Sequence, residues 1–280
     1  MEPVLLRSLI SMGILGVLLG AGLAFASKKF IVEVDPRIEA IEELLPGANC
    51  GACGFPGCAN FAEAVVSSQV SANGCVVGGA GIVDKISQIM GVESAGAVIP
   101  KKALLRCGGT CEKALDRGKY SGIEDCRAAT LLGGGTKACS FGCLGLGTCV
   151  DACPFKAIEM GDDGLPIVNK NICTGCGICV DICPKNLFTL VPETSDVHVL
   201  CASTMKGASV RKVCSAGCIG CKRCEKVCDT GAISVTDFLA SIDYEKCTTC
   251  GKCAENCPTS CIIVLSHQER GLVEVDDIAH

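Results

Sequence analysis

Cysteine is the residue of this chain best suited to chemistry, because 26 of the 280 residues are Cys and they recur in short runs. Two runs, which begin at Cys173 and Cys247, share the pattern C-x2-C-x2-C-x3-C-P. Three thiolates spaced by two residues can wrap one face of an iron-sulfur cubane, while the fourth swings away to a partner cluster. The runs therefore predict 4Fe-4S clusters with the ligands Cys173, Cys176, Cys179, Cys183, Cys247, Cys250, Cys253 and Cys257.

Disulfides and zinc are the alternative interpretations of so many cysteines. Disulfide scaffolds are typical of short secreted chains, whereas this chain is long, and Cys residues three apart on a tight turn rarely pair. Zinc ribbons use C-x2-C pairs, but they need neither a third Cys at the same spacing nor a Pro after the fourth. The spacing favours clusters in a reducing compartment. A zinc scaffold without redox activity would instead give a colourless protein.

A different pattern lies closer to the N-terminus, where Cys50, Cys53, Cys58 and Cys75 have the spacing C-x2-C-x4-C-x16-C. These four cysteines make one closed ligand set. The Gly residues among them let backbone amides approach the sulfurs of a cluster and tune its potential. We expect a further 4Fe-4S cluster here, with zinc as the alternative.

The rest of the chain, from about residue 137, is an internal repeat with a period near 75 residues. Each copy continues into a short hairpin and closes with one of the C-P runs, as in bacterial two-cluster ferredoxins. The sequence thus predicts two consecutive modules of that type. In this alignment Cys139, Cys143, Cys149 and Cys153 fall on Cys214, Cys218, Cys224 and Cys228.

The two copies differ at one ligand position, because Leu146 stands where the second copy has Cys221. Cys139 is the natural replacement, and without it that cluster would have three ligands and could be iron-deficient. The fourth Cys of each run crosses to the partner cluster. We therefore expect four sets: Cys139, Cys143, Cys149 and Cys183; Cys153, Cys173, Cys176 and Cys179; Cys218, Cys221, Cys224 and Cys257; and Cys228, Cys247, Cys250 and Cys253.

Five clusters account for 20 of the cysteines, and six remain: Cys107, Cys111, Cys126, Cys201, Cys214 and Cys261. Cys126 and Cys201 are also 75 residues apart, so part of this group belongs to the repeat. One hypothesis is a sixth cluster that uses Cys107 and Cys126 with some of Cys111, Cys201 and Cys214. The alternative is buried free thiols, because Cys packs as a small apolar residue. Cys261 is expected to be a core thiol.

Short elements must position these cysteines. Asp35 followed by Pro36 is typical of a helix start, and Pro46-Gly47 of its end. We further expect helices over 59–66 and 82–90, the second ending at Gly91, a strand within 98–106, and hairpins over 157–168 and 232–242.

The N-terminal segment has another character. Twenty uncharged residues, 8–27, are long enough to span a bilayer as a helix. Arg7 precedes them and Lys28-Lys29 follow, which favours a cytoplasmic location for the C-terminal side. A cleaved signal peptide is the alternative, since Ala24-Phe25-Ala26 resembles a cleavage site. The long apolar run and the two lysines favour an uncleaved anchor. Gly16 and Gly20 suit a close helix contact or an ordinary lipid-facing helix.

Composition limits the remaining functions. Aromatic residues make up only 4%, Trp is absent and Gly numbers 34, which suits small modules organised by metal clusters. A formal net charge of −5 gives no reason to expect nucleic acid. No glycine-rich nucleotide motif has a sensible context, so we expect no direct NAD or flavin site. His198, His267 and His280 are expected at the surface, and no residue set predicts bond-making catalysis.

The predicted fold class is α+β, with one N-terminal transmembrane helix, a four-Cys cluster domain and tandem bacterial-type two-cluster ferredoxin folds. The expected divisions are 1–27 for the anchor, 28–80 for the four-Cys domain, 81–136 for a connecting region, 137–192 and 193–266 for the ferredoxin modules, and 267–280 for a tail.

The anchor, the loop from Pro46 to Cys58 with Cys75, and the two modules together resemble the B subunit of the Rnf complex over essentially the whole chain. The loop is the specific part, because ferredoxin runs occur in many redox proteins. The second module resembles the longer form found in anaerobic bacteria. The resemblance implies a membrane-bound ferredoxin:NAD oxidoreductase that couples electron transfer to Na+ or H+ translocation.

In that family, the B subunit is the cluster-bearing electron carrier on the cytoplasmic side of the cell (inner) membrane. The resemblance implies soluble ferredoxin, the other Rnf subunits and the lipid bilayer as partners, with the flavin and NAD sites on other subunits. The alternative is a membrane-tethered polyferredoxin of a hydrogenase or another dehydrogenase. The anchor and the N-terminal loop argue against it, and co-purification with membrane flavoproteins would decide.

Five cations crowd around the first run of the second module in an otherwise acidic chain: Arg211, Lys212, Lys222, Arg223 and Lys226. Such a patch could steer an acidic ferredoxin toward that cluster. The alternative is an ordinary solvated face.

Overall fold

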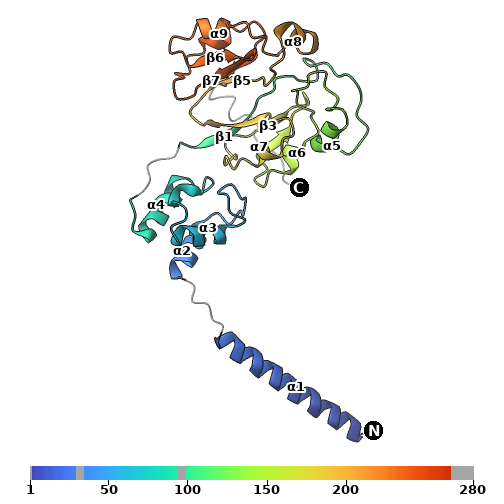
Figure 1. Cartoon of the computed structure of the whole chain (residues 1–280), viewed down its shortest axis with the longest axis vertical. Coiled ribbons are helices and arrows are strands. Elements are labelled where there is room, and N and C mark those ends of the chain that lie inside the picture. Colours follow the sequence, from blue (N-terminus) through green and yellow to red (C-terminus); the bar gives the residue numbers. More distant parts are fainter. Residues whose placement is uncertain (1, 30–34, 94–98, 266–280) are drawn as a thin grey trace, which may run out of the picture.

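A long apolar helix forms the N-terminal end of the molecule. The computed structural model describes residues 2–29, 35–93 and 99–265, and α1 (Glu2–Lys29) stands apart from the rest of them (Figure 1). Within Arg7–Lys29, an 18-residue window has a mean hydropathy of 2.2, and none of that window is buried. The 23 residues of Arg7–Lys29 extend about 35 Å, enough to cross a bilayer core. The helix thus includes the predicted span and continues through Lys28 and Lys29.

The four-Cys unit is built from short helices: α2 (Pro36–Leu44), α3 (Cys58–Val66), the 3-10 turn η1 (Ala72–Gly74) and α4 (Gly79–Met90). Asp35 caps α2 by accepting the Arg37 N–H at 2.9 Å, which confirms the predicted start. The helices enclose a small apolar core that includes Ile41, Phe61 and Ile86. Because α4 packs against α2, the expected boundary at residue 80 falls inside this unit.

The first ferredoxin module contains two antiparallel pairs of strands. The predicted hairpin forms from β2 (Ile158–Met160) and β3 (Pro166–Val168). The other pair joins β4 (Phe188–Pro192) to β1 (Lys101–Leu105). β1 confirms the strand expected within 98–106. Val98, at the start of that range, lies outside the described residues. Three short helices complete the module: α5 (Cys126–Leu131), α6 (Thr148–Asp151) and α7 (Ile178–Ile182).

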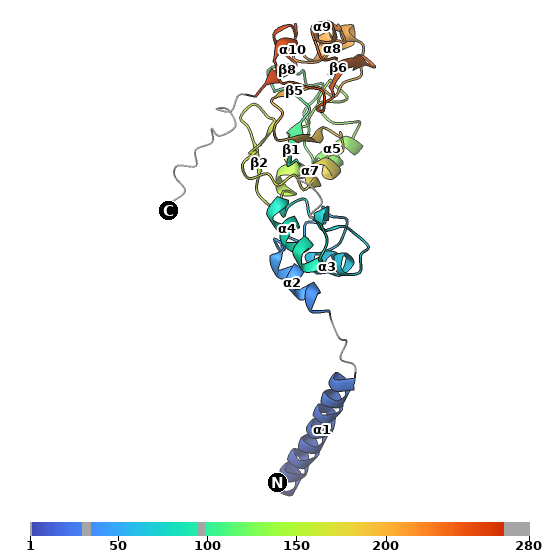
Figure 2. The same ribbon diagram turned by 90° about the vertical axis from the view of Figure 1, so that its left-hand side faces the viewer.

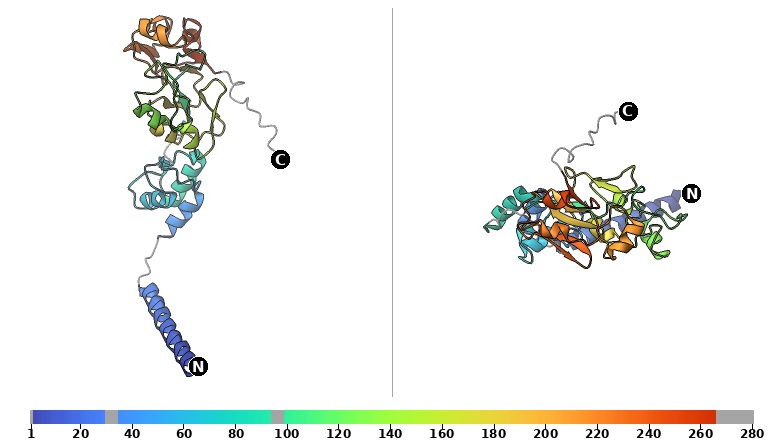
Figure 3. Two further views of the ribbon diagram at one scale, coloured as in Figure 1. Left: turned by 90° about the vertical axis from the view of Figure 1, so that its right-hand side faces the viewer. Right: turned by 90° about the horizontal axis from the view of Figure 1, so that it is seen from above.

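The second module repeats this plan. The predicted hairpin forms from β6 (Ile233–Thr236) and β7 (Leu239–Ile242), and β5 (Val197–Val199) pairs with β8 (Ile262–Val264). The short helices are α8 (Gly207–Val213), α9 (Arg223–Lys226) and α10 (Lys252–Glu255). Figures 2 and 3 show the four-Cys unit, the first module and the second module following one another along the long axis.

Residues 107–116 connect the two modules, although they belong to the region expected to be a simple connection. The Gly108 N–H donates to the Leu200 carbonyl at 2.9 Å, and the Leu115 N–H to the Val213 carbonyl at 2.9 Å. On its other side, the Leu115 carbonyl accepts the Ala138 N–H at 2.8 Å. This segment therefore holds parts of both modules together through its backbone.

His198 was expected at the surface, and this prediction is wrong. It lies in β5, where all three residues are buried, and its side chain is 0% exposed. Its Nδ1 lies 3.1 Å from the Tyr244 hydroxyl. The strand is covered on both faces, so alternation along it leaves no solvent side. His267 and His280 lie outside the described residues.

Candidate metal centres

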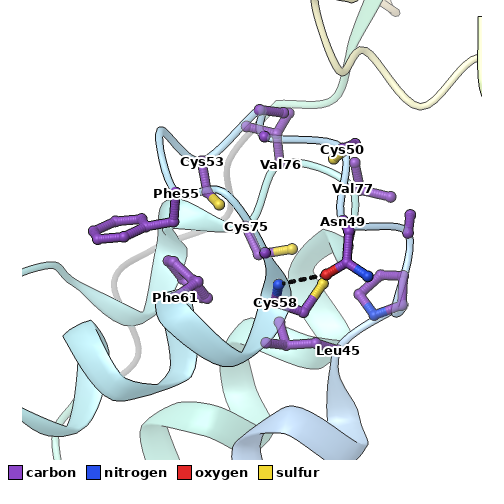
Figure 4. Close-up of a pocket in the computed structure, with 15 residues that line it drawn as sticks. Leu45, Asn49, Cys50, Cys53, Phe55, Cys58, Phe61, Cys75, Val76 and Val77 are labelled. Carbon is purple, nitrogen blue, oxygen red and sulfur yellow. Dashed lines mark hydrogen bonds between the residues drawn. The ribbon is translucent and has the colours of Figure 1, made fainter.

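The N-terminal set of cysteines surrounds one cavity, as its spacing predicts. Figure 4 shows Cys50, Cys53, Cys58 and Cys75 around this space, with Phe55, Phe61 and Leu45 among its walls. The Asn49 side chain holds the loop, because its Oδ1 accepts the N–H of Cys58 at 2.8 Å, where α3 begins. Burial raises the pKa of the Cys75 thiol, the Gly78 and Val77 N–H groups oppose this shift, and the nearby thiols of Cys53 and Cys58 add to it.

In two further expected sets, the four cysteines of each set line a cavity of their own. In both sets, the cross-over Cys from the first part of the repeat lies with the first three cysteines of the C-P run. One cavity is lined by Cys153, Cys173, Cys176 and Cys179, and the other by Cys228, Cys247, Cys250 and Cys253. Backbone donors point at these sulfurs. The Ala157 N–H lies 3.3 Å from the Cys153 sulfur, and the Ala103 N–H lies 3.5 Å from that of Cys173.

The expected set of Cys218, Cys221, Cys224 and Cys257 in the second module also comes together. Burial raises the pKa of Cys224 to about 11, with a contribution from the thiols of Cys218, Cys221 and Cys257. The four expected ligands therefore lie together. Cys221, which lies just before α9, is exposed, so this set reaches the surface there.

The structure corrects the remaining set, because Cys126 rather than Cys139 lies with Cys143, Cys149 and Cys183. Burial raises the pKa of Cys149 to about 11, and the thiols of Cys126 and Cys183 contribute. Burial likewise raises the pKa of Cys143 to about 12, with contributions from Cys107, Cys126 and Cys149. Cys126 thus adds a fourth thiol to this set, in which Leu146 provides none.

Cys139 lies instead with Cys107, Cys201 and Cys214 around a separate cavity between the modules. Burial raises the pKa of Cys139, and the thiols of Cys107 and Cys214 contribute. The backbone of Leu115 explains why Cys139 lies with Cys214, because it is hydrogen-bonded to Ala138 on one side and to Val213 on the other. The residues that follow, Cys139 and Cys214, are thereby brought to the same place.

These sites fit a multi-atom cluster. Four of the cavities share one lining pattern, with four cysteines around each. Within the described ranges, no three His, Cys, Asp or Glu side chains are arranged to hold a single metal ion. The donor sets are four sulfurs each, with backbone N–H groups beside them, and such sets suit iron-sulfur clusters.

Cys126 and Cys139 therefore lie in other groups than the expected ones, although the repeat contains a signal for this arrangement. Cys126 and Cys201 are related by the 75-residue period, as are Cys139 and Cys214. In the second copy, Cys221 provides the ligand that Cys126 provides in the first. Cys201 is therefore not required there and can belong to the set of Cys107, Cys139 and Cys214. Two thiols stay outside all six sets: exposed Cys111 and buried Cys261.

Comparison with known proteins agrees with this architecture. Residues 45–77 match a family model for an Fe-S cluster, and residues 137–187 and 217–261 match two models for a 4Fe-4S dicluster domain. The predicted α+β fold class with tandem ferredoxin-type domains is confirmed, and so is the presence of 4Fe-4S iron-sulfur cofactors.

Three relatives, each the B subunit of its complex, are 47% identical to this chain. That of the ion-translocating oxidoreductase complex of Methanosarcina acetivorans matches over 94% of this chain and 99% of its own length. That of the Na+-translocating ferredoxin:NAD+ oxidoreductase complex of Acetobacterium woodii matches over 90% and 75%. The proton-translocating counterpart of Clostridium ljungdahlii matches over 91% and 90%. This chain therefore belongs to the family of B subunits of ion-translocating oxidoreductase (Rnf-type) complexes, as a 4Fe-4S electron-transfer protein.

Proposed function

We propose that this chain passes electrons through six 4Fe-4S clusters between a soluble ferredoxin and the membrane part of an Rnf-type complex. The complex would couple ferredoxin:NAD redox chemistry to Na+ or H+ translocation, as the names of the relatives from A. woodii and C. ljungdahlii state for theirs. The observation that carries the proposal is a series of neighbouring four-Cys sets, in which thiols of the Cys50, Cys153, Cys126, Cys107 and Cys218 sets lie close enough to influence one another.

Thiols of successive sets are close enough to influence one another. Burial raises the pKa of Cys176, and the Cys50 thiol of the N-terminal set contributes. Burial also raises the pKa of Cys179 to about 12, with a smaller contribution from Cys149. The N-terminal set with Cys50 therefore neighbours the set with Cys153 and Cys176. That set in turn neighbours the set with Cys126 and Cys149.

The series continues across the module boundary through the Cys107 set. The Cys143 N–H points at the Cys107 sulfur at 3.5 Å. Burial raises the pKa of Cys201 to about 11, and Cys218 and Cys107 contribute. The sixth cluster, held by Cys107, Cys139, Cys201 and Cys214, would thus stand between the first and second modules.

Each cluster supplies one-electron redox chemistry when bound, and the chain's own residues set the conditions. Thiolates hold the iron, while backbone N–H groups beside the sulfurs favour the more negative reduced form. Apolar side chains such as Phe61 and Ile158 exclude water from the cavities. The protein thereby fixes the distances and potentials along the series.

The proposed orientation places the cluster domains on the cytoplasmic side, supported by Arg7 before the span and Lys28-Lys29 after it. The proposed ferredoxin contact is the cationic patch beside exposed Cys221. Lys222, Arg223 and Lys226 are exposed there, so an acidic partner could approach the set that contains Cys221.

Anaerobic purification with iron and acid-labile sulfide quantification, joined to a reductive EPR titration, tests the proposal. Six clusters predict about 24 iron atoms per chain, and five predict about 20. Low-potential signals from all of them would support the electron-transfer series. A colourless, EPR-silent protein that contains zinc would overturn it.

A further inference from the structure

One position recurs four times in the ferredoxin modules, four residues after each cross-over cysteine. It holds Ala157, Leu187, Ala232 and Cys261. The backbone N–H at this position points at the cysteine sulfur, at 3.3 Å for Ala157 to Cys153 and 3.5 Å for Leu187 to Cys183. The Cys261 N–H makes the equivalent contact with Cys257. The backbone role is therefore shared, and only Cys261 adds a thiol.

The Cys261 thiol is held against two cysteines of one ligand set. Its sulfur lies 3.6 Å from that of Cys257 and is in hydrogen-bond contact with the Cys218 side chain. Cys261 is only 2% exposed and belongs to the core that includes Val197, Ile233 and Ile262. A cysteine side chain has one S–H group, and this geometry directs that of Cys261 at the two sulfurs.

We propose that Cys261 is a positioning residue that donates its S–H to the ligand sulfurs of Cys257 and Cys218 and raises the potential of the cluster they share. The inference rests on the proposed function, since it requires a cluster on Cys218, Cys221, Cys224 and Cys257. Hydrogen bonds to cluster sulfurs stabilise the reduced form, which carries more negative charge. This cluster therefore accepts an electron more readily than its counterpart in the first module, where the Leu187 side chain has no donor.

The test compares the full-length wild-type chain with C261A, which places at 261 the residue found at 157 and 232. Iron content is expected to stay at the wild-type value. In EPR titration, one cluster is expected to shift to a lower potential, and its ratio of reduced to oxidised form at a fixed potential falls about fivefold, the effect of one hydrogen bond of about 1 kcal/mol.

Two variants serve as matched controls. C261S retains a donor and is expected to restore most of the wild-type titration. L187C introduces a thiol at the same position of the first module and is expected to raise the potential of a different cluster.

Either of two results would overturn the inference. A loss of about four iron atoms in both C261A and C261S would make Cys261 a ligand. Unchanged titration curves in C261A would mean that the Cys261 thiol only fills space in the core. Failure of the proposed function is distinct, because it would show as a wild-type chain without reducible clusters.

Discussion

Cys126 lies beside Cys143 and Cys149 because short polar contacts fix the backbone there. Asp125 caps α5 by accepting the Arg127 and Ala128 N–H groups at 2.8 and 2.9 Å. The Cys126 N–H donates to the Thr148 hydroxyl oxygen at 2.7 Å. Since Thr148 directly precedes Cys149, one contact ties two ligands of the same set together.

Replacing Cys126 with Ser is expected to remove its cluster or leave an iron-deficient one, because only three thiolates remain. Iron content should fall by up to about four atoms per chain, and a three-iron EPR signal would mark partial loss. C111S is the control, since Cys111 is exposed and outside all six sets. Equal iron in C126S and the wild type would contradict the assignment.

His198 predicts a pH dependence of stability. Burial lowers its pKa to about 4, with a contribution from Lys170. The folded state therefore keeps the ring neutral, while the unfolded chain takes up a proton below its ordinary pKa of 6.5. Stability is fully present above pH 6.5 and is lost progressively as the pH falls toward 4.

Between pH 7.5 and 5.5, this residue is expected to reduce the free energy of unfolding by about 1 kcal/mol. The measurement is the anaerobic denaturant midpoint, followed by loss of visible absorbance at both pH values. H198Q, whose amide does not titrate, is the control. If wild type and H198Q lost the same stability on acidification, His198 would not be responsible.

At the scale of elements, β1 supports the loop that carries the first C-P run. The Lys102 ammonium donates to the Cys173 carbonyl at 2.7 Å, and the Ala103 N–H points at the Cys173 sulfur. Gly175 lies against the Lys101 carbonyl with a φ of +72°. This close approach leaves no room for a side chain, so the strand and the loop fit only with Gly there.

G175A is expected to destabilise the first module by roughly 3 kcal/mol or more, because it adds a clash to an unfavourable backbone conformation. The matched variant is G177A, whose φ is +85° but whose Cβ would meet only Leu190 at 4.0 Å. Its expected cost is about 1 kcal/mol. Denaturant midpoints and iron content of both variants check this, and equal losses would argue against the packing explanation.

At the scale of the whole molecule, the elongated arrangement places the Cys107 set between the modules. C214S is expected to remove about four iron atoms and to separate the clusters into two groups. Chemical reductants should still reduce both groups, whereas electrons supplied by ferredoxin should no longer cross to the Cys50 side at the wild-type rate. Freeze-quench EPR measures this, and an unchanged crossing rate would show that electrons take another route.

The cationic patch also acts at this scale. Reversing Lys222, Arg223 and Lys226 to Glu is expected to slow ferredoxin-driven reduction at low salt and to weaken its salt dependence. Reversing three exposed lysines elsewhere, Lys85, Lys101 and Lys119, changes the net charge equally and is the control. If the wild type and the patch variant had the same reduction rate and the same salt dependence, the patch would be an ordinary solvated face and not a ferredoxin contact.

Features that depend on local spacing could be predicted from the sequence. The cluster runs, the hairpins, the capped helix after Asp35 and the apolar span are all written in residues close together in the chain. The 75-residue repeat was equally visible, since it needs only the order of cysteines. Local geometry fixes such features before any distant contact forms.

Which distant thiols meet depends on the tertiary structure. Cys126 lies beside Cys143 and Cys149 although it comes 17 residues before Cys143 in the chain. Cys139 joins Cys214 because the backbone of Leu115 is hydrogen-bonded to Ala138 and to Val213. The surface location expected for His198 failed for a similar reason, as β5 is covered by elements far away in sequence. Spacing alone carries no information about such contacts, because they depend on how the two modules pack.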